Sequence, residues 1–132
     1  MGKQTFEDIK DLDSIKILVD TFYDKVRRDD RLGPVFFAVI KDNWQPHLEK
    51  MYAFWNAALF SVPGFKGNPF ARHAPLPIEA VHFDRWISLF NQTVDEHFEG
   101  PNATEIKTKA GLMSVMFQSK LAAMKDSSRV II

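Results

Sequence analysis

The sequence of 132 residues contains no cysteine. Disulfides, cysteine-ligated zinc, iron–sulfur clusters and thiol nucleophiles are therefore excluded, and we expect a reducing, cytoplasmic compartment. The 17 Lys and Arg residues balance 17 Asp and Glu residues, so the basic charge typical of nucleic-acid binding is missing. Residues 1–14 lack the apolar core of a signal peptide, and no apolar run approaches the roughly 20 residues of a membrane span. We expect neither nucleic acid nor membrane as a partner.

Common catalytic motifs are missing as well. The sequence has no GxxxxGK[ST] or GxGxxG for nucleotides, no HExxH for zinc and no GxSxG for a nucleophilic serine. It therefore carries no hydrolase or nucleotide-binding signature.

The chain length predicts a single domain, residues 1–132. We expect its core over about residues 10–125 and a frayed C-terminal tail over residues 126–132.

Apolar residues recur at spacings of three and four in four stretches, which predicts amphipathic helices. These stretches are residues 14–26, 44–59, 78–98 and a last one from 102 or 104 to 124. Ser14 is the expected N-cap of the first helix. Residues 62–77 hold four prolines and two glycines, which leave room for at most one helical turn. No alternating β pattern occurs, so the predicted fold class is all-α.

Aromatic residues are in excess: 12 Phe, three Trp and two Tyr make up 13% of the chain. Tyr23 and Trp86 lie on the apolar faces of different predicted helices. Such residues are usually core, but each has one polar hydrogen that needs a partner when buried.

Two of the four histidines are candidate ligands. His73 lies on a short segment between Pro69 and Pro75, and this bracketing would fix the direction of its imidazole. His47 lies on an apolar helical face. Taken alone, each is more often a surface or edge residue than a ligand.

Glu79 and His82 form a Glu-x-x-His motif of the kind found in di-iron helical bundles. Such a site needs two copies of the motif and two further carboxylates, and only one copy exists, so we interpret it as a chance match. An aromatic-lined helical cavity with one rigid histidine instead meets the requirements of a flat apolar cofactor with one axial ligand, which haem fits.

The sequence resembles the truncated haemoglobins, specifically the bacterial group III branch, over roughly residues 10–125. Four segments carry the resemblance: FYDKVRRD at 22–29 followed by LGPVF at 32–36, WQPH at 44–47 with Phe54-Trp55, residues 67–77, and FDRWISLF at 83–90. The resemblance implies a two-over-two helical sandwich around a pocket for haem b (iron protoporphyrin IX).

The resemblance also implies roles for individual residues. His73 would be the proximal iron ligand, while the Tyr23 hydroxyl and the Trp86 indole N–H would face the bound gas. His47 would lie at the mouth of the distal pocket, and Met51 would cover the haem from the distal side.

Further residues would contact the haem itself. Phe36 or Phe37 would pack flat on the porphyrin, and the sequence leaves the choice between them open. Lys50 and Arg72 would meet the haem propionates through charge pairing at the rim.

The expected function is reversible, high-affinity binding of O2 and related diatomic ligands. Two donors in a low-dielectric pocket favour slow oxygen release, which argues against simple transport. The alternative is a haem-dependent redox enzyme, either a nitric oxide dioxygenase or peroxidase-like, which would need an external reductase. A third reading is a haem-free helical sensor or interaction module. We expect a monomer.

Overall fold

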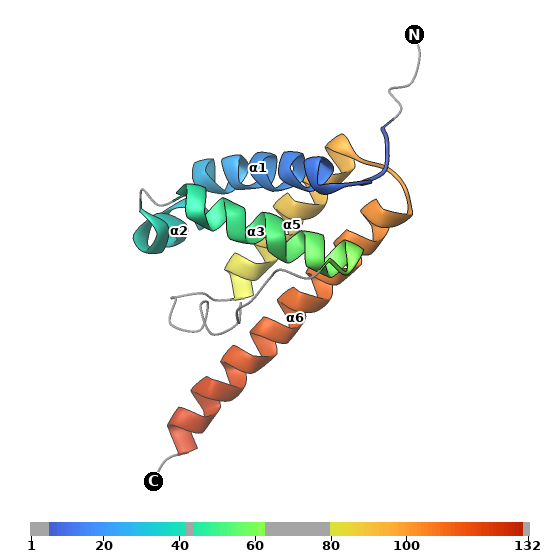
Figure 1. Cartoon of the computed structure of the whole chain (residues 1–132). Helices are drawn as coiled ribbons and strands as arrows, with labels where there is room; N and C mark the ends of the chain where they lie inside the picture. The colour runs from blue at the N-terminus through green and yellow to red at the C-terminus, as the bar shows by residue number, and fades with distance from the viewer. Residues whose placement is uncertain (1–5, 42–43, 63–79, 131–132) are drawn as a thin grey trace.

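The computed structural model describes residues 6–41, 44–62 and 80–130, and Figure 1 shows how its helices are arranged. These helices are α1 (Leu12–Arg28), α2 (Leu32–Ile40), α3 (Trp44–Phe60), α5 (Ala80–His97) and α6 (Pro101–Val130). The described residues form no strand, in agreement with the predicted all-α class. None of the described helices is long and apolar enough to cross a membrane.

Two pairs of helices make up the body of the molecule. α1 packs against α3, and α5 packs against α6, while α1 also contacts α5 and so joins the two pairs. α2 lies at the end of α1 and contacts α5 as well (Figure 1). Phe22 lies at the centre of this arrangement, 1% exposed, with the rings of Tyr23, Trp86 and Phe90 around it. The core therefore combines side chains from both pairs.

The N-terminus of α1 is capped by Asp11 and not by Ser14, the expected cap. The Asp11 carboxylate accepts hydrogen bonds from the Ser14 backbone N–H at 2.9 Å and from the Ser14 hydroxyl at 3.0 Å. A carboxylate can accept both bonds and also favours the positive end of the helix. Ser14 is therefore the third residue of the helix, and the predicted start is late.

The short helix α2 was not predicted, because Gly33 and Pro34 mark a break in the sequence. Pro34 is the third residue of α2, where its missing N–H has no intrahelical partner to lose. At Gly33 a Cβ atom would lie 2.9 Å from the Arg27 carbonyl oxygen, so the close approach of α2 to the end of α1 requires glycine. Both residues are thus compatible with a helix that starts close to the end of α1.

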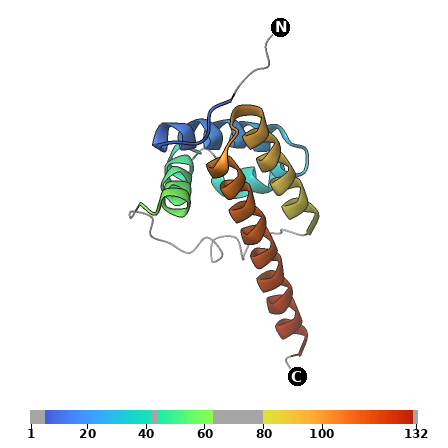
Figure 2. The same cartoon turned by 90° about the vertical axis from the view of Figure 1, so that its right-hand side faces the viewer.

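The last helix is longer than its apolar pattern indicated. α6 continues to Val130, beyond the predicted end at Met124. Figure 2, turned by 90° from Figure 1, shows that its C-terminal half extends away from the other helices.

The residues before α1 cap the start of α6. The Asp8 carboxylate accepts backbone N–H bonds from Asn102 at 2.9 Å and from Ala103 at 2.8 Å. The Asn102 side-chain amide donates to the carbonyl oxygen of the fully buried Ile9 at 2.7 Å. An acidic side chain from a distant segment thus satisfies the orphan N–H groups of α6.

We expect Asp8→Ala to lower the free energy of unfolding by about 1–2 kcal/mol, because two backbone N–H groups of α6 lose their acceptor. Urea denaturation followed by circular dichroism measures this difference. The control is Glu7→Ala, whose carboxylate pairs with Lys10 at the surface, and we expect a change within about 0.5 kcal/mol. Equal effects of the two variants would contradict the capping role of Asp8.

Candidate functional site

A largely apolar pocket lies where all five described helices meet. Its volume is ≈ 690 Å³, including the part that opens to solvent. The pocket is lined by Tyr23, Leu32, Val35, Phe36, Met51, Phe54, Trp55, His82, Phe83, Trp86, Met113, Ser114 and Phe117.

Tyr23 is a buried polar residue of the pocket wall. It lies on α1, is 5% exposed, and its ring contacts Phe22 and Phe36 at centroid distances of 4.9 and 6.0 Å. Burial raises the pKa of the Tyr23 hydroxyl, so the group keeps its proton and can act as a donor.

His47 lies behind Tyr23, on α3. Its ring meets the Tyr23 ring edge-on at a centroid distance of 4.9 Å and the Trp44 ring at 5.9 Å. Pro46 is the third residue of α3, and the helix begins before it. His47 is not among the residues that line the pocket, but it contacts Tyr23, which does.

Trp86, which carries an indole N–H, lines the pocket from α5. Its ring stacks on Phe90 at a centroid distance of 5.5 Å and meets the edge of Phe22 at 5.7 Å. Two aromatic neighbours thus fix the plane of a half-buried indole.

The structure distinguishes between the two phenylalanines of α2. Phe36 lines the pocket, whereas Phe37 is 63% exposed. Met51 lines the pocket from α3, and Lys50 is exposed on the same helix.

The remaining two predicted site residues, His73 and Arg72, lie outside the described residues. Their placement stays a prediction.

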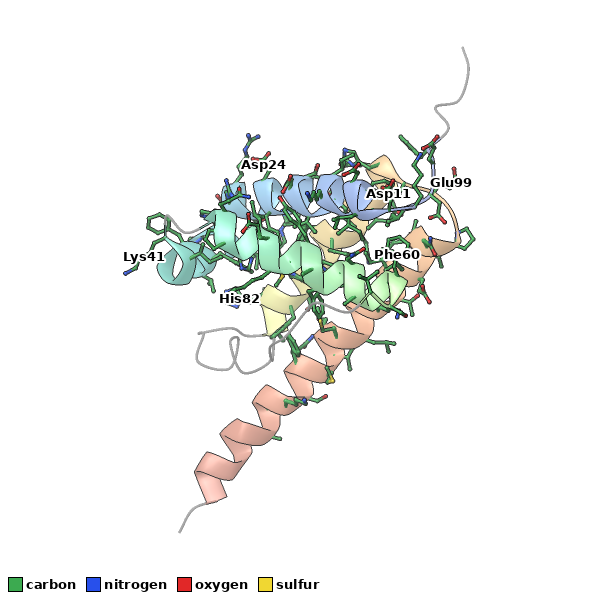
Figure 3. The ribbon with its side chains drawn as sticks, in the orientation of Figure 1. Asp11, Asp24, Lys41, Phe60, His82 and Glu99 are labelled. Atoms are coloured by element: carbon green, nitrogen blue, oxygen red, sulfur yellow. The ribbon has the colours of Figure 1, made fainter. Side chains whose placement is uncertain are left out.

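Sequence reasoning missed part of the pocket wall. His82 is the third residue of α5, near the start of that helix (Figure 3). It lies one turn before Trp86 and lines the pocket with it. The spacing of four residues places His82 on the face of Trp86, and this is the signal in the sequence that indicates the pocket position. Met113 and Ser114 line the pocket from α6. They lay on or beside the apolar face of a predicted helix, and periodicity does not tell which part of such a face borders a cavity.

The chemistry of the pocket fits a flat apolar cofactor such as haem. Most of its wall is aromatic or aliphatic, and its polar groups are the Tyr23 hydroxyl, the Trp86 indole, His82 and Ser114. Few polar groups in an apolar cavity are typical of cofactor sites, where they set orientation and specificity. Among the described residues no cluster of three His, Cys, Asp or Glu side chains could hold a metal ion directly.

Comparisons with known proteins agree with this geometry. The family described as bacterial-like globin matches residues 4–119 of the chain. The group 3 truncated hemoglobin ctb of Campylobacter jejuni is 31% identical over 113 residues, which cover 83% of this chain and 89% of that protein. The crystal structure of a group III truncated hemoglobin from Campylobacter jejuni aligns with a TM-score of 0.82 at 28% identity, covering 89% of this chain and 95% of that chain. The predicted two-over-two helical fold is thereby confirmed.

Proposed function

The chain belongs to the bacterial-like globin family and is a haem-binding globin, and on this premise we propose that it binds haem b and holds O2 and related diatomic gases with high affinity. The observation that carries this proposal is the buried Tyr23 hydroxyl on the wall of an apolar pocket that Trp86 also lines. When bound, haem supplies an iron atom that takes up diatomic gases.

The residues of the pocket act on the gas as hydrogen-bond donors. The protonated Tyr23 hydroxyl and the Trp86 indole N–H come from different helices, so they can approach one small ligand from two directions. A polarised gas molecule gains more from such donors in a low-dielectric pocket than in water. Phe36, Met51 and Phe54 exclude water from the same space. The expected consequence is slow release of oxygen.

The haem contacts that the resemblance implies complete the proposal. His73 would be the axial ligand, and Lys50 and Arg72 would pair with the propionates at the rim. Lys50 is exposed on α3 and directly precedes Met51, which lines the pocket, and this position supports a contact at the rim.

A second candidate function is a haem-dependent redox enzyme, and one observation favours it. His82 lines the pocket, and an imidazole there can accept and return a proton during peroxide or nitric oxide chemistry. Electrons would come from an external reductase.

Titration of the purified protein with haemin tests the proposed function. We expect one haem per chain with an intense Soret band, slow oxygen release, and only modest turnover of hydrogen peroxide. Phe36→Ala should speed haem loss, because it removes a side chain from the pocket wall. Phe37→Ala should leave haem loss unchanged, because that ring is exposed.

Failure to take up haem would reject the proposed function. Fast oxygen release together with efficient peroxide turnover would instead favour the redox enzyme.

A further inference from the structure

One buried carboxylate, that of Asp29, joins the helices on two sides of the pocket. It lies between α1 and α2, and its side chain is only 5% exposed. One oxygen, Oδ2, accepts the backbone N–H groups of Arg31 at 3.1 Å and Leu32 at 3.0 Å, at the start of α2. The other, Oδ1, accepts the Arg85 Nε–H from α5 at 2.6 Å. Asp29 thus caps α2 and binds α5 at the same time.

Both helices that Asp29 joins contribute side chains to the pocket wall. On α2, the capped first turn begins with Leu32 and continues to Phe36, and both side chains line the pocket. On α5, Arg85 directly precedes Trp86, which lines the pocket from that side. A shift of α2 relative to α5 would therefore change the distance between the Phe36 ring and the Trp86 indole.

The electrostatics favour a rigid link. Burial alone raises the pKa of Asp29, but the Leu32 backbone N–H and the Arg85 guanidinium outweigh burial and lower it. The carboxylate is therefore ionised near neutral pH, and its bond to Arg85 is charge-assisted. Such bonds are short and directional, more so for arginine than for lysine.

We propose that Asp29 and Arg85 are positioning residues that hold α2 and α5 at the separation at which Phe36 and Trp86 face the same gas-binding pocket. The inference rests on the proposed function, because it assigns the pair an effect on gas release. It differs from a purely stabilising role, since an ion pair that only stabilised the fold would leave the environment of Trp86 unchanged.

A second ion pair to α5, which comes from α1, provides a control. Lys25 of α1 and Glu96 of α5 pair at 2.6 Å, with side chains 23% and 44% exposed. Neither residue lines the pocket. Glu96→Gln therefore removes a carboxylate charge from an ion pair that does not border the pocket. Asp29→Asn removes a carboxylate charge from the ion pair that links α2 and α5 beside the pocket wall.

The variants to compare are Asp29→Asn, Arg85→Gln, the double variant, Arg85→Lys and Glu96→Gln. We expect Asp29→Asn and Arg85→Gln each to speed oxygen release by roughly threefold to tenfold, less than the roughly hundredfold that a misplacement of 1 Å can cost. The double variant should be no faster than the faster single variant, because both changes break one link. Arg85→Lys should recover part of the loss, and Glu96→Gln should match the wild type.

One of the two measurements does not require haem. The indole N–H resonance of Trp86 in the haem-free protein, assigned through Trp86→Phe, should shift in Asp29→Asn and Arg85→Gln but not in Glu96→Gln. The C–O stretching frequency of the carbon monoxide complex reports the same change in the loaded protein.

Two outcomes are distinguishable. If the wild type takes up haem but the Trp86 resonance and the oxygen release rate are unchanged in Asp29→Asn, the positioning role is overturned and the proposed function stands. If the wild type takes up no haem, the proposed function fails, and the Trp86 resonance of the haem-free protein still decides whether Asp29 positions the indole.

Discussion

His73→Ala is expected to lose haem, or to hold it only when free imidazole is added. His73 lies between Pro69 and Pro75, and the restricted backbone of such a segment suits a ligand whose direction must be fixed. No other residue is assigned to the proximal side of the iron by the resemblance to group III truncated haemoglobins. Removal of the imidazole therefore removes the one bond between iron and protein that we propose. The Soret spectrum and the rate of haem transfer to an apoprotein acceptor measure the loss.

The matched control for this variant is His47→Ala. The His47 ring contacts Tyr23 and Trp44, and His47 is not among the residues that line the pocket. We expect His47→Ala to retain haem fully and to change the rate of ligand entry. An unchanged spectrum at full occupancy in His73→Ala would show that the iron ligand is another residue.

The helices that the sequence predicted well are those with a continuous apolar face. In α1, Ile15, Leu18 and Phe22 recur at spacings of three and four, and all are buried. The pattern thus located the helix to within a few residues, but the cap was misassigned, because Asp11 and Ser14 are both good capping residues. Only the hydrogen bonds of the folded chain distinguish them.

The shortest helix was missed for the opposite reason. α2 has only nine residues, too few to show a clear period, and Gly33 and Pro34 are the residues that usually mark a turn. What stabilises α2 is tertiary: Asp29 caps it, and Leu32 packs in the core with 2% exposure. Local sequence patterns carry none of this information.

The candidate site was partly predictable because its residues lie in recognisable motifs. Tyr23, Phe36 and Trp86 belong to the segments that resemble group III truncated haemoglobins, and all three line one pocket. Met113 and Ser114 lie outside those segments, so their approach to the pocket depends on how α6 crosses α5. That crossing follows from the packing of whole helices, which a single sequence does not display.

The largest effect on gas binding is expected from Tyr23→Phe and Trp86→Phe. Each variant removes one hydrogen-bond donor from a pocket with few polar groups, while an aromatic ring of similar shape remains at Tyr23. The loss of such a donor costs on the order of 1–3 kcal/mol, equivalent to roughly a fivefold to 150-fold faster release of oxygen. Stopped-flow measurement of oxygen dissociation gives the rates, and Phe37→Ala, which alters an exposed ring, is the control.

The double variant distinguishes a shared ligand from two separate effects. If the Tyr23 hydroxyl and the Trp86 indole donate to the same gas molecule, each bond alters the charge available to the other, and the two losses should not add. This coupling acts through the gas molecule, so the two rings do not need to touch. Both rings also pack on Phe22, at centroid distances of 4.9 and 5.7 Å. That common neighbour is a second route of coupling, so Phe22→Leu is measured as well. Non-additivity that persists in the Phe22→Leu background indicates coupling through the gas. Strict additivity, or unchanged release in either single variant, would show that the two donors do not share one ligand.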